Sequence, residues 1–193
     1  MSGKNTAKVV RFLLRSTEKR GHNINQVAKS LRISVGSSFQ VLKELKKKGM
    51  AVSEQIGNAT YYSLDFENPE TVKLCELLLL EEKRQLKGYA KVYAADIQQF
   101  SHATLIILFG SILTRKEFND VDVLFVTDKV KEVNDFCLDL SKVRAKPIVP
   151  LILKKEDLLH ELRDRNGAVV SIIKEGVVLK GESALIEVAK HAK

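Results

Sequence analysis

Residues 23–50 read NINQVAKSLRISVGSSFQVLKELKKKGM, and this stretch decides the fold of the N-terminal third of the chain. Asn23 and Gln26 have the spacing of a capping box, in which each side chain bonds the backbone N–H of the other residue. Ser34 can cap a second helix, which is expected to end at Gly49 because glycine readily takes the left-handed conformation that follows many helices. The stretch therefore predicts two helices joined by a tight turn at residues 32–34.

The second of these predicted helices has an apolar side and a polar side. Its apolar side, through Phe39, Leu42 and Leu45, is expected to face the core. A glycine inside its first turn costs up to about 1 kcal/mol of helix stability, so Gly36 either admits the close approach of a ligand or softens the helix. The residues expected to face outward are Val35, Gly36, Ser37, Gln40 and Lys43.

The flanking segments complete a small domain. Apolar residues repeat at helical spacing from Thr6 to Ser16, which predicts a helix before the stretch quoted above. Residues 51–55 and 60–64 have the composition of two strands, and residues 56–59 between them have the composition of a turn. The sequence thus predicts three helices followed by a β-hairpin.

Positive charge is concentrated in this same region. The first 65 residues carry 12 Lys and Arg against 4 Asp and Glu, a surplus of +8 that equals the net charge of the whole chain, while the remaining residues balance at 20 against 20. Such segregation favours a polyanionic partner, because lysines and arginines that neutralise phosphates release condensed counterions. The alternative is a solvated, lysine-rich surface that binds nothing.

On these residues the N-terminal region resembles the winged helix-turn-helix domains of prokaryotic transcription regulators. The basic helix tail at residues 42–49 and the following hairpin carry the resemblance. It implies that the helix after Ser34 enters the major groove of double-stranded DNA, while the hairpin contacts the DNA backbone or the minor groove. The DNA-binding residues that it implies are Ser34, Gly36, Ser37, Gln40, Lys43, Lys46, Lys47 and Asn58.

The chemistry of these side chains suggests different contacts. Gln40 is expected to contact a base, since a carboxamide can pair bidentately with adenine, whereas Ser37 and Lys43 are expected to bond phosphates. The lysines at 46–48 equally suit a solvated helix end, where positive charge is favourable to the helix dipole. Winged helices also bind proteins, so a protein partner stays open.

A long connecting helix is expected at residues 67–100. Five apolar residues fall seven apart, which predicts one continuous packed seam: Val72, Leu79, Leu86, Tyr93 and Phe100. Dimerisation through this seam is favoured, because winged-helix regulators commonly bind paired DNA half-sites as homodimers. The competing interpretation is that the seam packs against a flanking domain.

The C-terminal region begins with an apolar strand that stops abruptly. Residues 104–109 form an unbroken apolar run ended by Gly110 and Ser111, and a second strand is expected at residues 120–126. Asp120 and Asp122 lie two apart on it, so both project from one face. Adjacent carboxylates repel each other and favour a divalent cation such as Mg²⁺.

A second interpretation of the two aspartates needs no ligand. At the rim of the sheet they would be exposed and paired with Arg115 or Lys116. Gly110 and Ser111 likewise suit a sharp strand-to-helix turn, with the serine as the helix cap.

The combination resembles the minimal nucleotidyltransferases of the DNA polymerase beta superfamily. The resemblance covers residues 101–193, where a helix at 131–143, a strand at 148–153, a helix at 156–165 and a tail at 172–180 agree with it. It implies that Gly110 and Ser111 bind a nucleoside triphosphate. It also implies that Asp120 and Asp122 bind Mg²⁺ and are catalytic in an active member.

Three departures from that family point to lost catalysis. Eight residues separate Ser111 from Asp120 where about ten are usual, and residues 112–116 contain no glycine. Active members also use a third carboxylate on the next strand, where this chain has Val149, Pro150 and Leu151. Its absence should weaken ion binding and remove a group expected to help activate the attacking hydroxyl.

The predicted fold class is α+β with two domains. A winged helix-turn-helix domain is expected at residues 1–66 and a helical connector at 67–100. An α/β nucleotidyltransferase-like domain with a small mixed sheet is expected at 101–193. Two cysteines, far apart in sequence, exclude a zinc motif or disulfide framework. No signal peptide or membrane segment is found, which indicates the cytoplasm.

Three functions follow from these expectations. The first is a homodimeric DNA-binding transcription regulator whose C-terminal domain has become a sensor or interaction platform. The alternative is a Mg²⁺-dependent enzyme that moves a nucleoside monophosphate from a triphosphate to a protein or small acceptor. The third is an adaptor that binds proteins alone.

Overall fold

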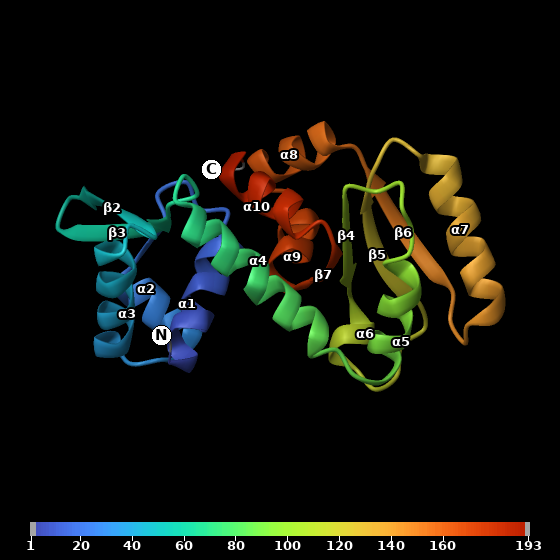
Figure 1. Ribbon diagram of the computed structural model, residues 1–193, viewed down its shortest axis with the longest axis horizontal. Helices are drawn as coiled ribbons and strands as arrows, with labels where there is room; N and C mark the ends of the chain where they lie inside the picture. The colour runs from blue at the N-terminus through green and yellow to red at the C-terminus, as the bar shows by residue number, and fades with distance from the viewer. Residues whose placement is uncertain (1–2, 192–193) are drawn as a thin grey trace. The chain divides into compact units, whose positions relative to one another are not determined.

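The computed structural model describes residues 3–191 and shows an α+β architecture with two small sheets (Figure 1). The chain divides into two compact units. The first holds the described residues up to Leu78 together with those from Ile186 onward, and the second holds Leu79–Leu185. The division falls inside two helices, α4 (Pro69–Arg84) and α10 (Glu182–His191).

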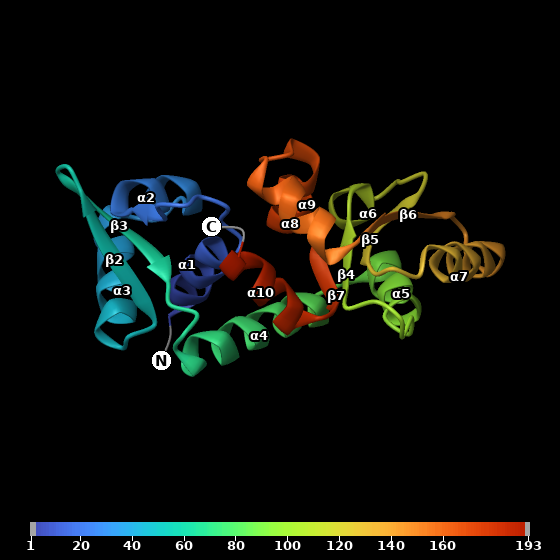
Figure 2. The ribbon, with the colours of Figure 1, turned by 90° about the horizontal axis from the view of Figure 1, so that it is seen from above.

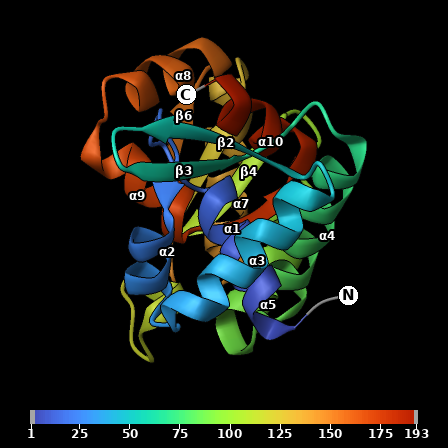
Figure 3. The ribbon, with the colours of Figure 1, turned by 90° about the vertical axis from the view of Figure 1, so that its left-hand side faces the viewer.

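The first unit is built from helices and one antiparallel sheet of order β1-β3-β2. The β2–β3 hairpin begins beside the C-terminal end of α3 (Figure 3). The two-residue strand β1 was not predicted, because a single short pairing with β3 leaves no alternating pattern in the sequence. The elements are α1 (Lys4–Leu14), β1 (His22–Asn23), α2 (Ile24–Leu31), α3 (Val35–Lys47), β2 (Ala51–Ile56) and β3 (Ala59–Leu64).

The local signals in residues 23–50 are confirmed. Asn23 Oδ1 accepts a hydrogen bond from the Gln26 N–H at 2.9 Å, and Gln26 Oε1 accepts one from the Asn23 N–H at 2.9 Å. Ser34 Oγ caps α3 by accepting from the Ser37 N–H at 3.1 Å. Gly49 follows α3 with φ +67°. These caps fix where α2 and α3 begin and where α3 ends.

The orientation of Phe39 in α3 differs from the prediction. Phe39 was expected in the core but is 45% exposed, whereas its neighbour Ser38 is completely buried. The Ser38 hydroxyl donates to the Ile24 carbonyl oxygen at 3.1 Å, so the small polar side chain is satisfied where α3 packs against α2. Ser38, Leu42 and Leu45 form the inward face, and a buried serine gives no hydrophobic signal.

The expectation of one long connecting helix is wrong. Two helices, α4 and α5 (Gly88–Ile97), occupy this region, and Gly88 has φ +55°, a conformation outside the α-helical region. Of the seven-residue seam, Tyr93 and Phe100 lie in the apolar core of the second unit, with exposed fractions of 1% and 5%. These two side chains are therefore covered within one chain, and the homodimer stays a prediction.

The second unit contains a four-stranded mixed sheet of order β6-β5-β4-β7, as predicted for this region. β5 pairs antiparallel with β4 and parallel with β6, and β7 joins the other side of β4 antiparallel. Helices α5 and α7 cover one face of this sheet (Figure 2). The elements are β4 (Leu105–Phe109), α6 (Ser111–Thr114), β5 (Val121–Val126), α7 (Val130–Val143), β6 (Ile148–Leu153), α8 (Lys155–Arg163), α9 (Gly167–Glu175) and β7 (Val177–Lys180).

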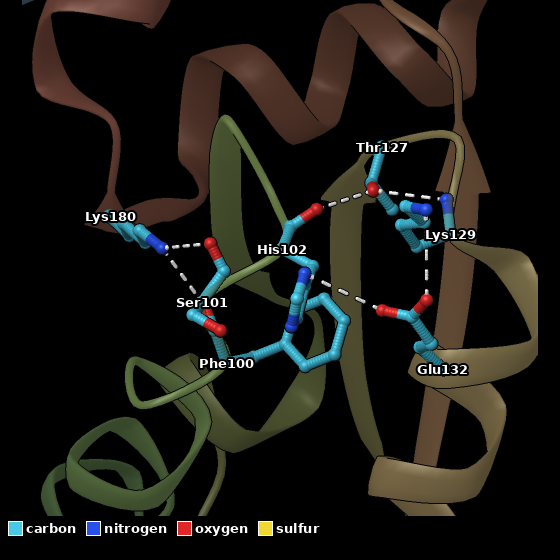
Figure 4. A network of polar contacts seen from close by, with 7 residues as sticks. All are labelled: Phe100, Ser101, His102, Thr127, Lys129, Glu132 and Lys180. Carbon is cyan, nitrogen blue, oxygen red and sulfur yellow. Dashed lines mark hydrogen bonds and ion pairs between the residues drawn. The ribbon is translucent and has the colours of Figure 1, made fainter.

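A polar network fixes the loop that precedes β4 (Figure 4). Thr127 donates its hydroxyl to the His102 carbonyl oxygen at 2.5 Å. Lys180 Nζ donates to the carbonyl oxygens of Phe100 and Ser101 at 3.0 and 2.9 Å. Because β4 runs antiparallel to β5, these contacts lie at the end of the sheet opposite to Gly110. They hold the start of β4 in place relative to β5 and β7.

Of the helices in residues 3–191, none combines the length and the hydropathy that crossing a lipid bilayer requires.

Candidate functional site

The outward side of α3, with the turn before it, forms the first candidate site, hereafter the α3 surface. The predicted residues of this helix reach solvent, except that Ser37 is half-buried and bonded to Asn5 Nδ2 through its hydroxyl at 3.1 Å. Phe39 is an addition that the sequence interpretation missed. The exposed residues of the α3 surface are Ser34, Val35, Gly36, Phe39, Gln40, Lys43, Lys46 and Lys47.

The charge of the α3 surface is positive. Glu44, the acidic residue of α3, is paired with Lys48 at 2.7 Å, and the hydrogen bond from Lys48 lowers the pKa of the Glu44 carboxyl. Within residues 3–191, Lys43, Lys46 and Lys47 form no ion pair. Their ammonium groups are free to bind external anions such as phosphates.

Gly36 has no role in the packing of the unit. It lies in the first turn of α3, and a Cβ added to it would meet nothing within 4 Å. Its φ is not in the left-handed region, so the backbone does not require glycine here. Gly36 therefore weakens α3, and nothing in the packing of the unit requires a glycine at this position.

Arg32 ends α2: its N–H donates to the Lys29 carbonyl oxygen at 3.4 Å, and the Ile33 N–H donates to the Ala28 carbonyl oxygen at 3.1 Å. Arg32 is exposed in the turn between α2 and α3 and has φ +51°, a left-handed conformation that costs a non-glycine residue about 1–2 kcal/mol. The sequence interpretation placed the turn at residues 32–34 but did not select Arg32. Its position directly after α2 was the available signal, since glycine or asparagine is usual there.

Two hydrogen bonds support the tip of the β2–β3 hairpin. Gly57 turns the chain with φ +58°, and Asn58 beside it is exposed, as predicted. Gln55 braces the turn, because its Nε2 donates to the Gly57 carbonyl oxygen at 3.0 Å and its Oε1 accepts from the Thr60 hydroxyl at 2.8 Å.

The second candidate site lies where β4 ends. Phe109 pairs with Asp122 across β4 and β5, and Gly110 follows with φ +83°. A Cβ on Gly110 would collide with the Asp122 carboxylate, so this position needs glycine both for its conformation and for space. The structure thus brings Gly110 and Asp122 together. Burial, and secondly the charge of Asp120, raise the pKa of Asp122.

A pocket of about 320 Å³ opens beside this turn. It offers two hydroxyl groups, a guanidinium and a carboxylate. Glu175, at the end of α9, was not predicted from the sequence, while Asp120 and Asp122 are not among the lining residues. The pocket is lined by Gly110, Ser111, Leu113, Thr114, Arg115 and Glu175.

The two aspartates have no cationic partner in the described part of the chain. Neither Asp120 nor Asp122 is paired with Arg115 or Lys116, so the ion pair suggested from the sequence is not formed, while the interpretation of two ligand-free aspartates at the rim of the sheet stays open. On the neighbouring strand β6, Val149 lies opposite Asp122 and is 45% exposed, and Pro150 lies opposite Val123. No acidic residue stands on β6.

Among residues 3–191, no three or more histidines, cysteines, aspartates or glutamates are grouped as metal ligands. Two carboxylates fit Mg²⁺ when phosphate oxygens of a bound substrate complete the coordination, because Mg²⁺ is often held by one or two carboxylates together with phosphates. The residues present therefore suit an ion that arrives with a triphosphate better than one held by protein alone.

Comparison of the chain with protein-family models, curated proteins and solved structures gives no match.

Proposed function

We propose that the protein is a DNA-binding transcription regulator and that its first unit is a winged helix-turn-helix domain. The observation that carries this proposal is the α3 surface, on which Lys43, Lys46 and Lys47 have no ion-pair partner within the described chain. Gly36 adds support, because it weakens the helix locally and has no packing role, and Arg32 adds an exposed cation in the turn before α3. Double-stranded DNA is the ligand that this combination of charge and exposed helix favours.

In the proposed complex, α3 lies in the major groove. Lys43, Lys46 and Lys47 bond phosphates and supply affinity that does not depend on sequence, while Gln40 contacts a base. Gly36 admits the sugar-phosphate backbone close to the start of α3. Asn58 at the hairpin tip contacts the DNA backbone or the minor groove. Two copies of the chain bind paired half-sites as a homodimer.

The second unit is proposed to be a nucleotidyltransferase-like domain that has lost catalysis and acts as a sensor or interaction platform. The absence of a carboxylate opposite Asp122 on β6 supports lost catalysis. The pocket beside Gly110 and Ser111 offers a place for a nucleotide. A nucleotide or protein partner bound to this domain could alter DNA binding only if it discriminates between two arrangements of the chain. Such a regulator would act in the cytoplasm.

The test is a fluorescence-anisotropy titration of the full chain with a labelled duplex at several salt concentrations. We expect the logarithm of the association constant to fall linearly as the logarithm of salt concentration rises, because each neutralised phosphate releases counterions. Absent binding, or binding that salt does not change, would remove the proposal.

A second candidate function is favoured by the contact between Gly110 and Asp122. It is the transfer of a nucleoside monophosphate, in which a hydroxyl of a protein or small acceptor attacks the α-phosphate of a triphosphate and pyrophosphate leaves. A bound Mg²⁺ would neutralise phosphate charge, while Asp120 and Asp122 hold it and Ser111 orients the phosphates. The double substitution Asp120→Ala with Asp122→Ala must then abolish transfer of labelled nucleotide. If the wild-type chain transfers none and binds no triphosphate, this candidate fails.

A further inference from the structure

The α3 surface contains a short apolar strip within its basic surroundings. Val35 is 53% exposed and Phe39 is 45% exposed. The two residues are four apart, so they lie on the same side of the helix. Because α3 buries Ser38, which lies about 100° around the helix from Phe39, turning Phe39 inward would require the helix to rotate. Phe39 therefore faces outward as a result of how the unit packs.

The Phe39 ring has a cation beside it. Lys43 Nζ lies 5.6 Å from the centre of the ring, an attraction between the ammonium and the face of the aromatic ring. The interaction places the Phe39 ring next to Lys43, a side chain that is proposed to bind phosphate. Gln40, the residue after Phe39, supplies a carboxamide on the exposed side of the same turn.

We propose that α3 recognises an A·T base pair step, in which Phe39 contacts the 5-methyl group of thymine and Gln40 pairs with adenine. The inference rests on the proposed function, DNA binding, and specifies which base pairs the α3 surface selects. In the major groove, the base-pair edges present hydrogen-bonding groups, the small C5–H of cytosine and the 5-methyl group of thymine. The methyl group is the largest apolar group there, so it is the partner that best matches an apolar side chain on a helix in that groove.

A protein partner is the other occupant that an exposed phenylalanine suggests. The apolar strip consists of two residues, whereas stable protein interfaces bury about 1,200–2,000 Å² in total. The side chain beside it is Lys43, and Glu44, the acidic residue of α3, is paired with Lys48. Charge complementarity therefore favours the polyanion.

The experiment begins with a duplex selected from a random library by the full chain. Each thymine of the selected site is then replaced by deoxyuridine, which removes the 5-methyl group alone, and the dissociation constant is measured by anisotropy at fixed salt. We expect replacement of one or two thymines per half-site to weaken binding about fourfold, the effect of losing one buried methyl group. Replacement elsewhere should have no effect.

Variants of the chain assign the effect to Phe39. In Phe39→Ala the same replacements should have no effect on binding, because the partner of the methyl group is absent. Phe39→Leu should keep part of the sensitivity. The matched control Leu77→Ala removes an apolar side chain that is 48% exposed in the first unit outside α3, and it should keep all of the sensitivity. Lower salt restores measurable binding if Phe39→Ala is weak.

The outcomes separate this inference from the function on which it rests. Binding that deoxyuridine does not affect, or that it affects equally in wild type and Phe39→Ala, overturns the role of Phe39 and leaves DNA binding intact. Failure to bind any duplex removes both proposals. Loss of binding to a protein in Phe39→Ala, with DNA binding unchanged, identifies a protein partner and also overturns the inference.

Discussion

At the scale of single residues, Arg32 holds a left-handed conformation that arginine disfavours. We predict that Arg32→Gly leaves the free energy of unfolding unchanged or raises it by up to about 1 kcal/mol, because glycine takes this conformation without steric cost. The same substitution should weaken DNA binding and reduce the salt slope by about one unit, through loss of one phosphate contact. Urea denaturation and anisotropy measure the two effects. Unchanged DNA binding would show that Arg32 contacts no phosphate.

A second prediction at the scale of single residues follows from the raised pKa of Asp122. Its raised pKa means that the folded chain binds the proton more tightly than the unfolded chain, so the ionised carboxylate destabilises the fold at neutral pH. Stability gained by protonation appears as the pH falls through the raised pKa and is complete below about 3.9, the ordinary value for aspartate. We therefore predict that Asp122→Asn raises the thermal midpoint at pH 7 and that this gain disappears near pH 4.

The control for Asp122→Asn is Asp135→Asn, at an exposed position on α7. This substitution should leave the thermal midpoint unchanged at both pH values. A gain in Asp122→Asn that is equally large at pH 4 would contradict the assignment, because it could not arise from ionisation.

At the scale of elements, α3 carries a glycine that its structure does not need. We predict that Gly36→Ala raises the free energy of unfolding by about 0.5–1 kcal/mol, the difference in helix propensity, since the new Cβ meets nothing within 4 Å. DNA binding should weaken at the same time, because the methyl group would occupy the space of the approaching backbone. A stabilised variant with wild-type affinity would show that Gly36 serves no ligand.

The ends of α3 allow an independent check of how this helix is positioned. Ser34→Ala removes the side chain that accepts from the Ser37 N–H, and we predict a loss of about 1 kcal/mol of stability in urea denaturation. Ser30→Ala, at an exposed position near the end of α2, is the matched control and should change stability by less than about 0.5 kcal/mol. Equal effects of both would mean that Ser34 is not the cap.

The same element shows what the sequence could predict and what it could not. Caps and turns depend on neighbouring residues, so Ser34, Gly49 and the hairpin turn were predicted from local patterns. The side of α3 that packs inward depends on α2, and there the buried Ser38 displaced Phe39 from its predicted place. The outward positions of Gln40 and Lys43 were nevertheless predicted, because the helical period places them opposite Leu42 and Leu45.

At the second candidate site, too, the sequence predicted some features and missed others. The resemblance to nucleotidyltransferases implied that Gly110 and Asp122 share a site, and the antiparallel register of β4 and β5 brings the two residues together. Glu175 reaches the pocket because β7 pairs with the other side of β4, a pairing between distant parts of the chain that local patterns do not reveal. Helix α10 was missed altogether.

At the scale of the whole molecule, the C-terminal residues belong to the first unit. Ile186, Val188 and Ala189 are each at most 7% exposed, and Lys190 pairs with Glu67 at 2.6 Å. We predict that a chain ending at Leu185 loses at least about 3 kcal/mol of stability in the first unit, mainly through lost apolar burial. Lys190→Ala should cost less than about 1 kcal/mol, since exposed ion pairs contribute little. Urea denaturation measures the stability of both chains against the wild type. A chain ending at Leu185 that is as stable as the wild type would contradict the prediction.

The most direct measurement of the central claim compares two charge-reversed chains by anisotropy with one duplex. The first carries Lys43→Glu, Lys46→Glu and Lys47→Glu on the α3 surface. The second carries Lys91→Glu, Lys131→Glu and Lys174→Glu at exposed positions of the second unit, so that net charge is equal. We predict that the first loses at least about 100-fold in affinity and about three units of salt slope, while the second stays within about threefold of wild type. Equal losses in both chains would contradict the assignment of DNA binding to α3.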